Sequence, residues 1–155
     1  MKTKQLIFVL LFMSFSIFAQ KSEIPDKVKS AFNKAYPNIL KVKWDKENQN
    51  TYEAEFKQNN DAISVVFDSE GKILETEVSI LISQLPKAIE PFILKNYKEY
   101  KISEAAKITD SKGAVTFEAE IKSGEKKKDL LFDSNGNIIN KKENKQEEDK
   151  ETDED

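Results

Sequence analysis

The sequence predicts an α+β fold: a tandem repeat of a helix followed by a four-stranded antiparallel meander, with the helices packed on the sheet. First, VVFDSEGKILE at 65–75 returns as LLFDSNGNIIN at 130–140. Second, TYEAEF at 51–56 returns at the same offset as TFEAEI at 116–121. Third, the apolar residues of each copy change from helical spacing to strict alternation. Similar segments in the same order indicate an internal duplication, with copies at 24–80 and 85–142.

A helix is expected at the start of each copy. Ile24–Pro25 opens the first, and its apolar face comprises Val28, Ala31, Phe32, Ala35 and Tyr36. Leu85–Pro86 opens the second, whose apolar face comprises Ile89, Phe92, Ile93 and Tyr97. Proline suits a helix start but costs about 3 kcal/mol in a helix interior. Because Pro91 falls inside the second pattern, we expect a kink or a late helix start there.

Strands follow each helix. Apolar and polar residues alternate over 40–44, 52–56 and 63–67, which is typical of antiparallel strands with one buried face. Leu40, Val42 and Trp44 are expected on the buried side of the first strand. The Asp-Ser-x-Gly segments at 68–71 and 133–136 combine a side-chain acceptor with a glycine, as a tight hairpin turn requires.

The two ends of the chain differ from the middle. Residues 1–19 contain Lys2, Lys4 and an apolar run too short to span a bilayer, which predicts a signal peptide and a location in the periplasm or outside the cell; an uncleaved anchor is the alternative. Residues 20–142 would form the folded domain. Residues 143–155 predict a disordered tail, because 147–155 hold seven acids and one lysine. The tail is a solubilising end or, alternatively, an interaction segment.

Composition excludes several classes of function. The chain has no histidine and no cysteine, so it lacks a Ser–His–Asp apparatus and a histidine zinc site. All 25 basic residues are lysine, and the net charge is −3, which argues against binding to nucleic acid. We therefore expect a monomeric protein that is no enzyme and needs no cofactor or metal.

Two carboxylate patterns resemble catalytic or metal sites. Glu53 and Glu55, like Glu118 and Glu120, would lie about 7 Å apart on one strand face, close to the spacing of glycosidase acids. We favour a solvated outer strand face, because the acids alternate with apolar residues and stand where the pattern requires a polar side chain. The polar residues around Gly136 resemble a calcium loop, but the glycine stands at the wrong position for an EF-hand, and a turn explains them without an ion.

These motifs together resemble a known family. The Ile-Pro or Leu-Pro helix start, the Tyr36–Pro37 helix end, the Tyr-Glu-Ala-Glu-Phe strand and the Phe-Asp-x-x-Gly hairpin resemble the PepSY-like family of secreted bacterial proteins, which is similar in fold to the β-lactamase inhibitor protein. The resemblance covers about residues 24–142. It implies a non-enzymatic periplasmic or secreted protein with a concave sheet that can hold a protein partner, and it carries over no inhibitory residue.

The functional hypothesis is a binding module that contacts an envelope protein or peptide through the polar sheet face, with inhibition as one version. The residues expected on this partner face are Lys41, Lys43, Trp44, Glu53, Glu55, Glu118 and Glu120. Trp44 would either join the core or anchor the partner at the rim. The alternative is a small-ligand carrier with a pocket between helix and sheet, lined by Tyr52, Phe67 and Phe117.

Overall fold

The computed structural model describes residues 23–141, which form an eight-stranded antiparallel sheet, two α-helices and a short 3-10 helix. The α+β class is therefore confirmed. The predicted signal peptide at 1–19 and acidic tail at 143–155 lie outside the described residues. The elements in chain order are α1 (Asp26–Ala35), β1 (Val42–Lys46), β2 (Thr51–Gln58), β3 (Asp61–Asp68), β4 (Ile73–Ser79), η1 (Ile82–Gln84), α2 (Ile89–Asn96), β5 (Lys101–Asp110), β6 (Val115–Ser123), β7 (Lys126–Asp133) and β8 (Ile138–Lys141).

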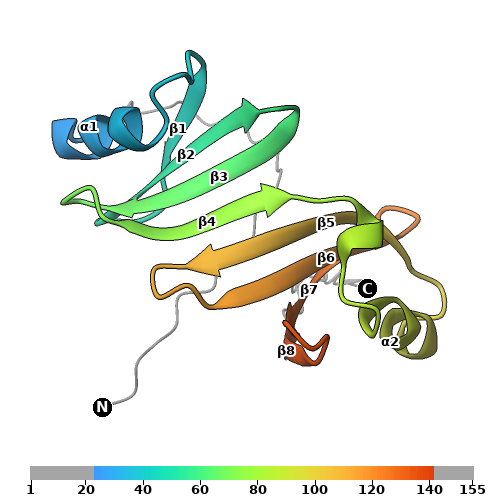
Figure 1. The fold of residues 1–155 in the computed structure, drawn as a ribbon. Helices are drawn as coiled ribbons and strands as arrows, with labels where there is room; N and C mark the ends of the chain where they lie inside the picture. Colours follow the sequence, from blue (N-terminus) through green and yellow to red (C-terminus); the bar gives the residue numbers. More distant parts are fainter. Residues whose placement is uncertain (1–22, 142–155) are drawn as a thin grey trace, which may run out of the picture.

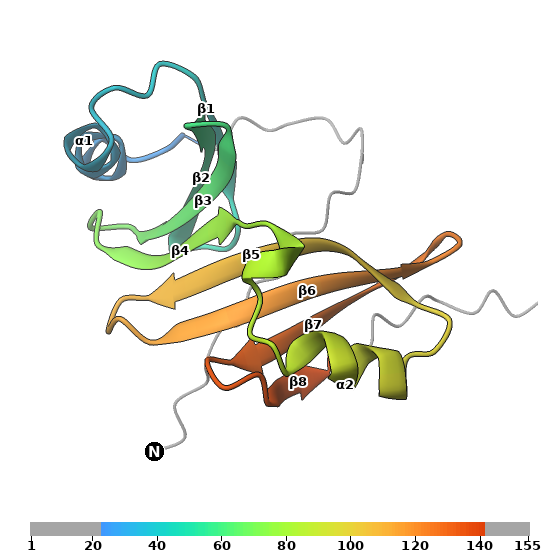
Figure 2. The same cartoon turned by 45° about the vertical axis from the view of Figure 1, so that its right-hand side comes forward.

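The strands follow one another across the sheet in sequence order, from β1 to β8. The pairing of β4 with β5 joins the two helix-plus-four-strand halves into one sheet. Figure 1 shows α1 beside the strands of the first half and α2 beside those of the second. The strand direction turns steadily across the sheet, so β1–β3 and β5–β7 run at a steep angle to each other (Figure 2), as strand twist requires.

Helix α1 is bounded by Pro25 at its start and by Pro37 after its end. The Pro25 carbonyl accepts hydrogen bonds from the amides of Val28 and Lys29, at 3.0 and 3.1 Å, and starts the first turn. At the other end the Tyr36 amide donates to the Phe32 carbonyl at 2.8 Å, and the following proline disfavours further helix. Val28 and Phe32 face the sheet and are fully buried.

Helix α2 shows the late start that Pro91 predicts. The helix begins at Ile89, three residues after Pro86, so Pro91 is its third residue. Amides in the first turn have no partner within the helix, so proline is tolerated there. Ile89 and Ile93 are buried against the sheet.

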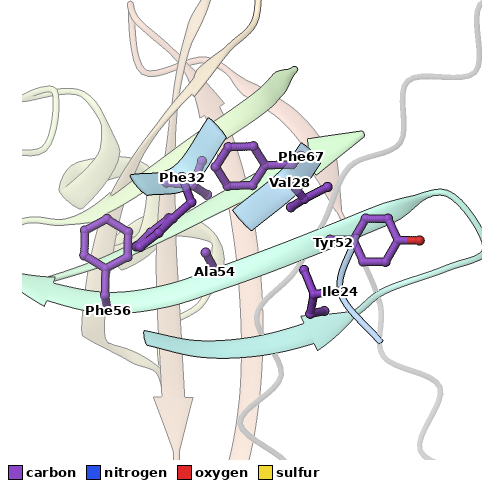
Figure 3. Packing of buried hydrophobic residues seen from close by; sticks show 8 residues of the cluster. Ile24, Val28, Phe32, Tyr52, Ala54, Phe56 and Phe67 are labelled. Carbon is purple, nitrogen blue, oxygen red and sulfur yellow. The ribbon is translucent and has the colours of Figure 1, made fainter. Parts of the chain in front are cut away.

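Each helix covers its own core cluster on the same face of the sheet. The first cluster packs α1 against β2 and β3 (Figure 3), and the Phe32 ring lies between 5.3 and 6.5 Å from those of Tyr36, Trp44, Phe56 and Phe67. The second cluster packs α2 against β5, β6 and β7 through Ala105, Ala119, Ile121, Leu130 and Phe132. Val65 pairs with Thr76, and Thr76 pairs with Thr109, so the core-facing side chains of both halves point to one face of the sheet. Within residues 23–141, no helix covers the other face.

The expectation for Leu40 is wrong. The strand begins at Val42, and Leu40 lies in the preceding loop with 94% of its surface exposed. The Tyr36–Pro37 end of α1 and the turn to Ile39 delay the strand, so the apolar alternation starts two residues later than the sequence pattern indicates.

The Asp-Ser-x-Gly turn occurs three times. Asp68 and Asp133 each accept backbone amides two and four residues later, and Gly71 and Gly136 have φ of +84°. Asp110 does the same between β5 and β6, at a place where the first half turns differently. Gly71 also lies against α1: a Cβ there would come within 2.8 Å of the Lys27 carbonyl oxygen.

Candidate functional site

The sheet face opposite the helices is rich in carboxylates. By the strand register, side chains on this face alternate with those of the core, and acids occupy it on seven of the eight strands. We call this surface the acidic face. Its acids are Asp45, Glu53, Glu55, Asp68, Glu75, Glu77, Glu104, Asp110, Glu118, Glu120, Asp129 and Asp133.

A β-bulge places the central pair of acids on this face. Phe67 pairs with Ile73, but Val66 pairs with Glu75, so Leu74 is an extra residue in β4. Without this insertion, Glu75 and Glu77 would point toward the helix side, because a one-residue shift reverses every side chain of a strand. The bulge therefore brings Glu77 beside Ser64 of β3 and Ile108 of β5.

The structure brings most of the predicted partner residues together. Lys43, Glu53 and Glu55 lie on the acidic face in the first half, and Glu118 and Glu120 lie on it in the second. Lys41 is exposed in the loop just before β1. Residues 53 and 118 are separated in sequence but share one surface, because β4–β5 pairing makes the sheet continuous.

Trp44 does not join this surface. It lies on the helix side, half-buried, with its ring centroid 5.3 Å from that of Phe32 and 6.2 Å from that of Phe67. Of its two predicted roles, the structure gives it the place of a core residue.

The interpretation of the glutamates as a solvated strand face is wrong for two of them. Glu53 is 3% exposed and Glu118 is 7% exposed. The hydroxyl of Ser64 donates to a Glu53 carboxylate oxygen, which offsets part of the cost of burial. Burial still raises the pKa of Glu53 above its ordinary value, with the Ser64 hydrogen bond acting in the opposite direction.

Two lysines form ion pairs at the margins of the acidic face. The Lys43 ammonium lies 2.8 Å from the Glu55 carboxylate on the β1 edge. Lys127 lies 3.0 Å from Glu120, whose other oxygen accepts a 2.6 Å hydrogen bond from Ser103. Lys127 belongs to a cross-strand row with Lys101 and Lys122 at one end of β5–β7, so positive charge gathers at that end and negative charge in the middle.

Two acids, Glu77 on β4 and Glu47 next to the β1 edge, have raised pKa values. Burial raises the pKa of Glu77 to about 8, and the neighbouring carboxylates of Glu75, Glu53, Asp129 and Glu55 add to the rise. Burial likewise raises the pKa of Glu47, at the β1–β2 turn, to about 7, with Glu53 as the next cause. Both groups therefore exchange protons near neutral pH.

Several of these residues were missed by sequence reasoning. No functional role was given to Glu75, Glu77 or Asp129 in the sequence analysis. The available signal was the alternation in Glu75–Thr76–Glu77, which resembles that of Glu53–Ala54–Glu55.

The carboxylates that resemble metal or catalytic groups in the sequence are bound to neighbouring residues. Within residues 23–141, the side chains form no metal-binding group of three or more acids, histidines or cysteines. At the loop that resembles a calcium site, both Asp133 carboxylate oxygens accept hydrogen bonds from turn residues, including two from Asn137. The Glu53 and Glu55 carboxylates are each bound to a neighbour of their own, Ser64 and Lys43.

The chain belongs to the PepSY-like family. The family model described as "Putative beta-lactamase-inhibitor-like, PepSY-like" matches twice, over residues 16–75 and 50–140. The predicted resemblance is therefore confirmed. No curated protein sequence matches the chain.

Solved structures of Bacteroides proteins share the fold. A DUF2874 family protein from Bacteroides uniformis has a TM-score of 0.66 at 22% identity, covering 75% of this chain and 86% of its own. A BLIP-like protein from Bacteroides fragilis has a TM-score of 0.60 at 24% identity, with coverages of 76% and 85%. A protein from Bacteroides eggerthii described as "putative periplasmic" has a TM-score of 0.68 at 16% identity, with coverages of 76% and 87%. In the described part of this chain, neither helix has the length and apolar character needed to cross a membrane.

Proposed function

We propose that this protein is a non-enzymatic binding module of the cell envelope that holds a protein or peptide partner on the acidic face. The observation that carries this proposal is a charged sheet face that neither helix covers, spanning both halves of the molecule. The likeness to a BLIP-like protein supports a protein partner.

Location and assembly follow the same proposal. The leader-like residues 1–19 and the likeness to a protein described as periplasmic support a periplasmic or secreted location. We propose a monomer that presents the acidic face to a different protein. Inhibition of an envelope hydrolase is one form such binding could take, by analogy of fold alone.

The carrier alternative has less support. Its three expected lining residues belong to two separate clusters: Tyr52 and Phe67 are buried under α1, and Phe117 packs under α2. The Phe67 ring lies 6.5 Å from that of Phe32 and 6.2 Å from that of Trp44, so these side chains fill the core beneath the first helix.

We also infer that the two halves are copies of one ancestral unit. Tyr52 pairs with Phe67 in the first half as Phe117 pairs with Phe132 in the second. A register shift follows at Val66/Phe67 and at Leu131/Phe132, the same point of each repeated hairpin. These shared irregularities support duplication, because bulges are retained within families.

Blocking one face of the sheet tests the proposed function. Ser79 is exposed on the acidic face of β4, and Lys107 is exposed on the helix side of the adjacent strand. Envelope proteins retained by the immobilised wild-type chain should be lost with Ser79→Trp and kept with Lys107→Trp. If both variants retain the same proteins as the wild type, the acidic face is not the binding surface.

A further inference from the structure

We propose that the partner contacts the acidic face through a lysine- or arginine-rich extended segment, which lies over β2 to β5 with Glu77 at its centre. This inference rests on the proposed function and specifies the chemistry of the partner. It follows from the charge of the face, the spacing of its acids and the place of its lysines.

The charge distribution selects a cationic partner. The strip from β2 to β5 presents Glu53, Glu55, Glu75, Glu77 and Asp110, and Lys43 pairs with Glu55 at its outer edge. Burial raises the pKa of Glu77 to about 8, and a cation held beside it would favour the ionised carboxylate. Glu75 stands directly opposite Asp110 across the β4–β5 pair, although like charges in this position are destabilising. A sheet that gathers acids in this way is complementary to positive charge, which favours both encounter and specificity.

Several acids of the face are accessible to basic side chains of a partner. Glu55, Glu75, Glu77 and Glu120 are partly exposed and Glu104 is exposed, whereas Glu53 and Glu118 are buried. The exposed group can meet a partner directly.

The spacing favours an extended chain over a small cation. Glu75 and Glu77 are two residues apart on one strand, so they project on the same side about 7 Å apart. Alternate lysines of an extended segment have the same spacing.

The lysine row fixes where the segment lies. Lys101, Lys122 and Lys127 line one end of β5–β7 on the same side of the sheet. Like charges would repel a basic segment from that end. The segment is therefore placed over the first half and the junction of the two halves.

The test uses the mature chain and a labelled peptide of four Lys-Thr repeats, with a peptide of four Gln-Thr repeats as its uncharged counterpart. The face variant carries Glu55→Gln, Glu75→Gln and Glu77→Gln. The matched control carries Glu90→Gln, Glu99→Gln and Glu125→Gln, which remove three exposed acids outside the acidic face. Circular dichroism establishes that both variants are folded.

We expect the lysine peptide to bind and the glutamine peptide not to bind. The face variant should weaken binding by about tenfold or more, the control by about threefold or less, since distant charges act only through screened attraction. Binding should weaken as salt is raised. Equal losses in both variants, equal binding of both peptides, or displacement by spermine at the same concentration of charge would each overturn the inference.

The outcome separates this inference from the proposed function. If Ser79→Trp abolishes retention of an envelope protein while the lysine peptide does not bind, the face is a docking surface of different chemistry and only the present inference fails. If the lysine peptide binds but neither the face variant nor Ser79→Trp changes peptide binding or envelope retention, the acidic face is not the surface used, and both fail.

Discussion

At the scale of single residues, the clearest effects on stability are expected at two glycines and at one partly buried acid. Gly71 and Gly113 share nearly the same φ, +84° and +82°, but differ in surroundings. A Cβ at Gly71 would meet the Lys27 carbonyl oxygen at 2.8 Å and the Ala31 side chain at 3.0 Å, whereas a Cβ at Gly113 meets nothing within 4 Å.

We therefore expect Gly71→Ala to destabilise more than Gly113→Ala. The left-handed backbone alone costs about 1 kcal/mol for alanine, and the contact with α1 should bring the Gly71 loss to about 2–4 kcal/mol. Urea unfolding of the two variants measures the difference. Equal losses would mean that the turn does not press on α1 in solution.

Glu77 makes stability depend on pH. Its pKa is raised by burial to about 8 in the folded protein from an ordinary value of 4.5, so the folded state binds the proton more tightly than the unfolded chain. Folding therefore loses stability as pH rises from the unfolded to the folded pKa. We expect Glu77→Gln to match the wild type near pH 4.5 and to exceed it above pH 8, by about 2 kcal/mol after allowance for solvent screening.

Chemical denaturation of wild type and Glu77→Gln across this pH range tests the expectation. Glu99→Gln, at an exposed position, is the control and should leave the pH profile unchanged. A wild-type chain that gains stability relative to Glu77→Gln as pH rises would contradict the assigned burial.

At the scale of elements, alternation and proline placement were sufficient to predict the helices and most strands. Pro86 and Pro91 together predicted the late start of α2, and period-two spacing predicted β2 and β3. The position of Glu77 could not be predicted in this way. It depends on the extra residue Leu74 in β4 and on the pairing of β4 with β5. The alternation of residues within one strand predicts neither a β-bulge nor which strand lies next to it.

Helix α1 depends on Phe32 for its attachment to the sheet. The ring is 1% exposed and contacts four other aromatic rings. Phe32→Ala should destabilise the protein by about 3–5 kcal/mol, as for other buried aromatic truncations. Leu94→Ala, on the exposed side of α2, should change stability by less than about 0.5 kcal/mol; calorimetry that ranks them the other way would contradict the packing.

At the scale of the whole molecule, the continuous sheet should make the two halves unfold together. A unit of about 60 residues is marginal alone, and removing either half would expose β4 or β5 as an unpaired edge. Fluorescence of Trp44, the single tryptophan, reports the first half only. Its urea midpoint should coincide with that from far-UV circular dichroism, and separate midpoints would show that the halves unfold independently.

The central claim is that the sheet face opposite the helices receives a basic partner segment, and amide chemical-shift mapping by NMR tests it most directly. Titration of the labelled mature chain with the Lys-Thr peptide should shift amides of β2, β4 and β5 around Glu55, Glu77 and Asp110, and leave those of α1 and α2 nearly unchanged. Shifts concentrated on the helices or on the lysine row of β5–β7, or no shifts at all, would contradict it.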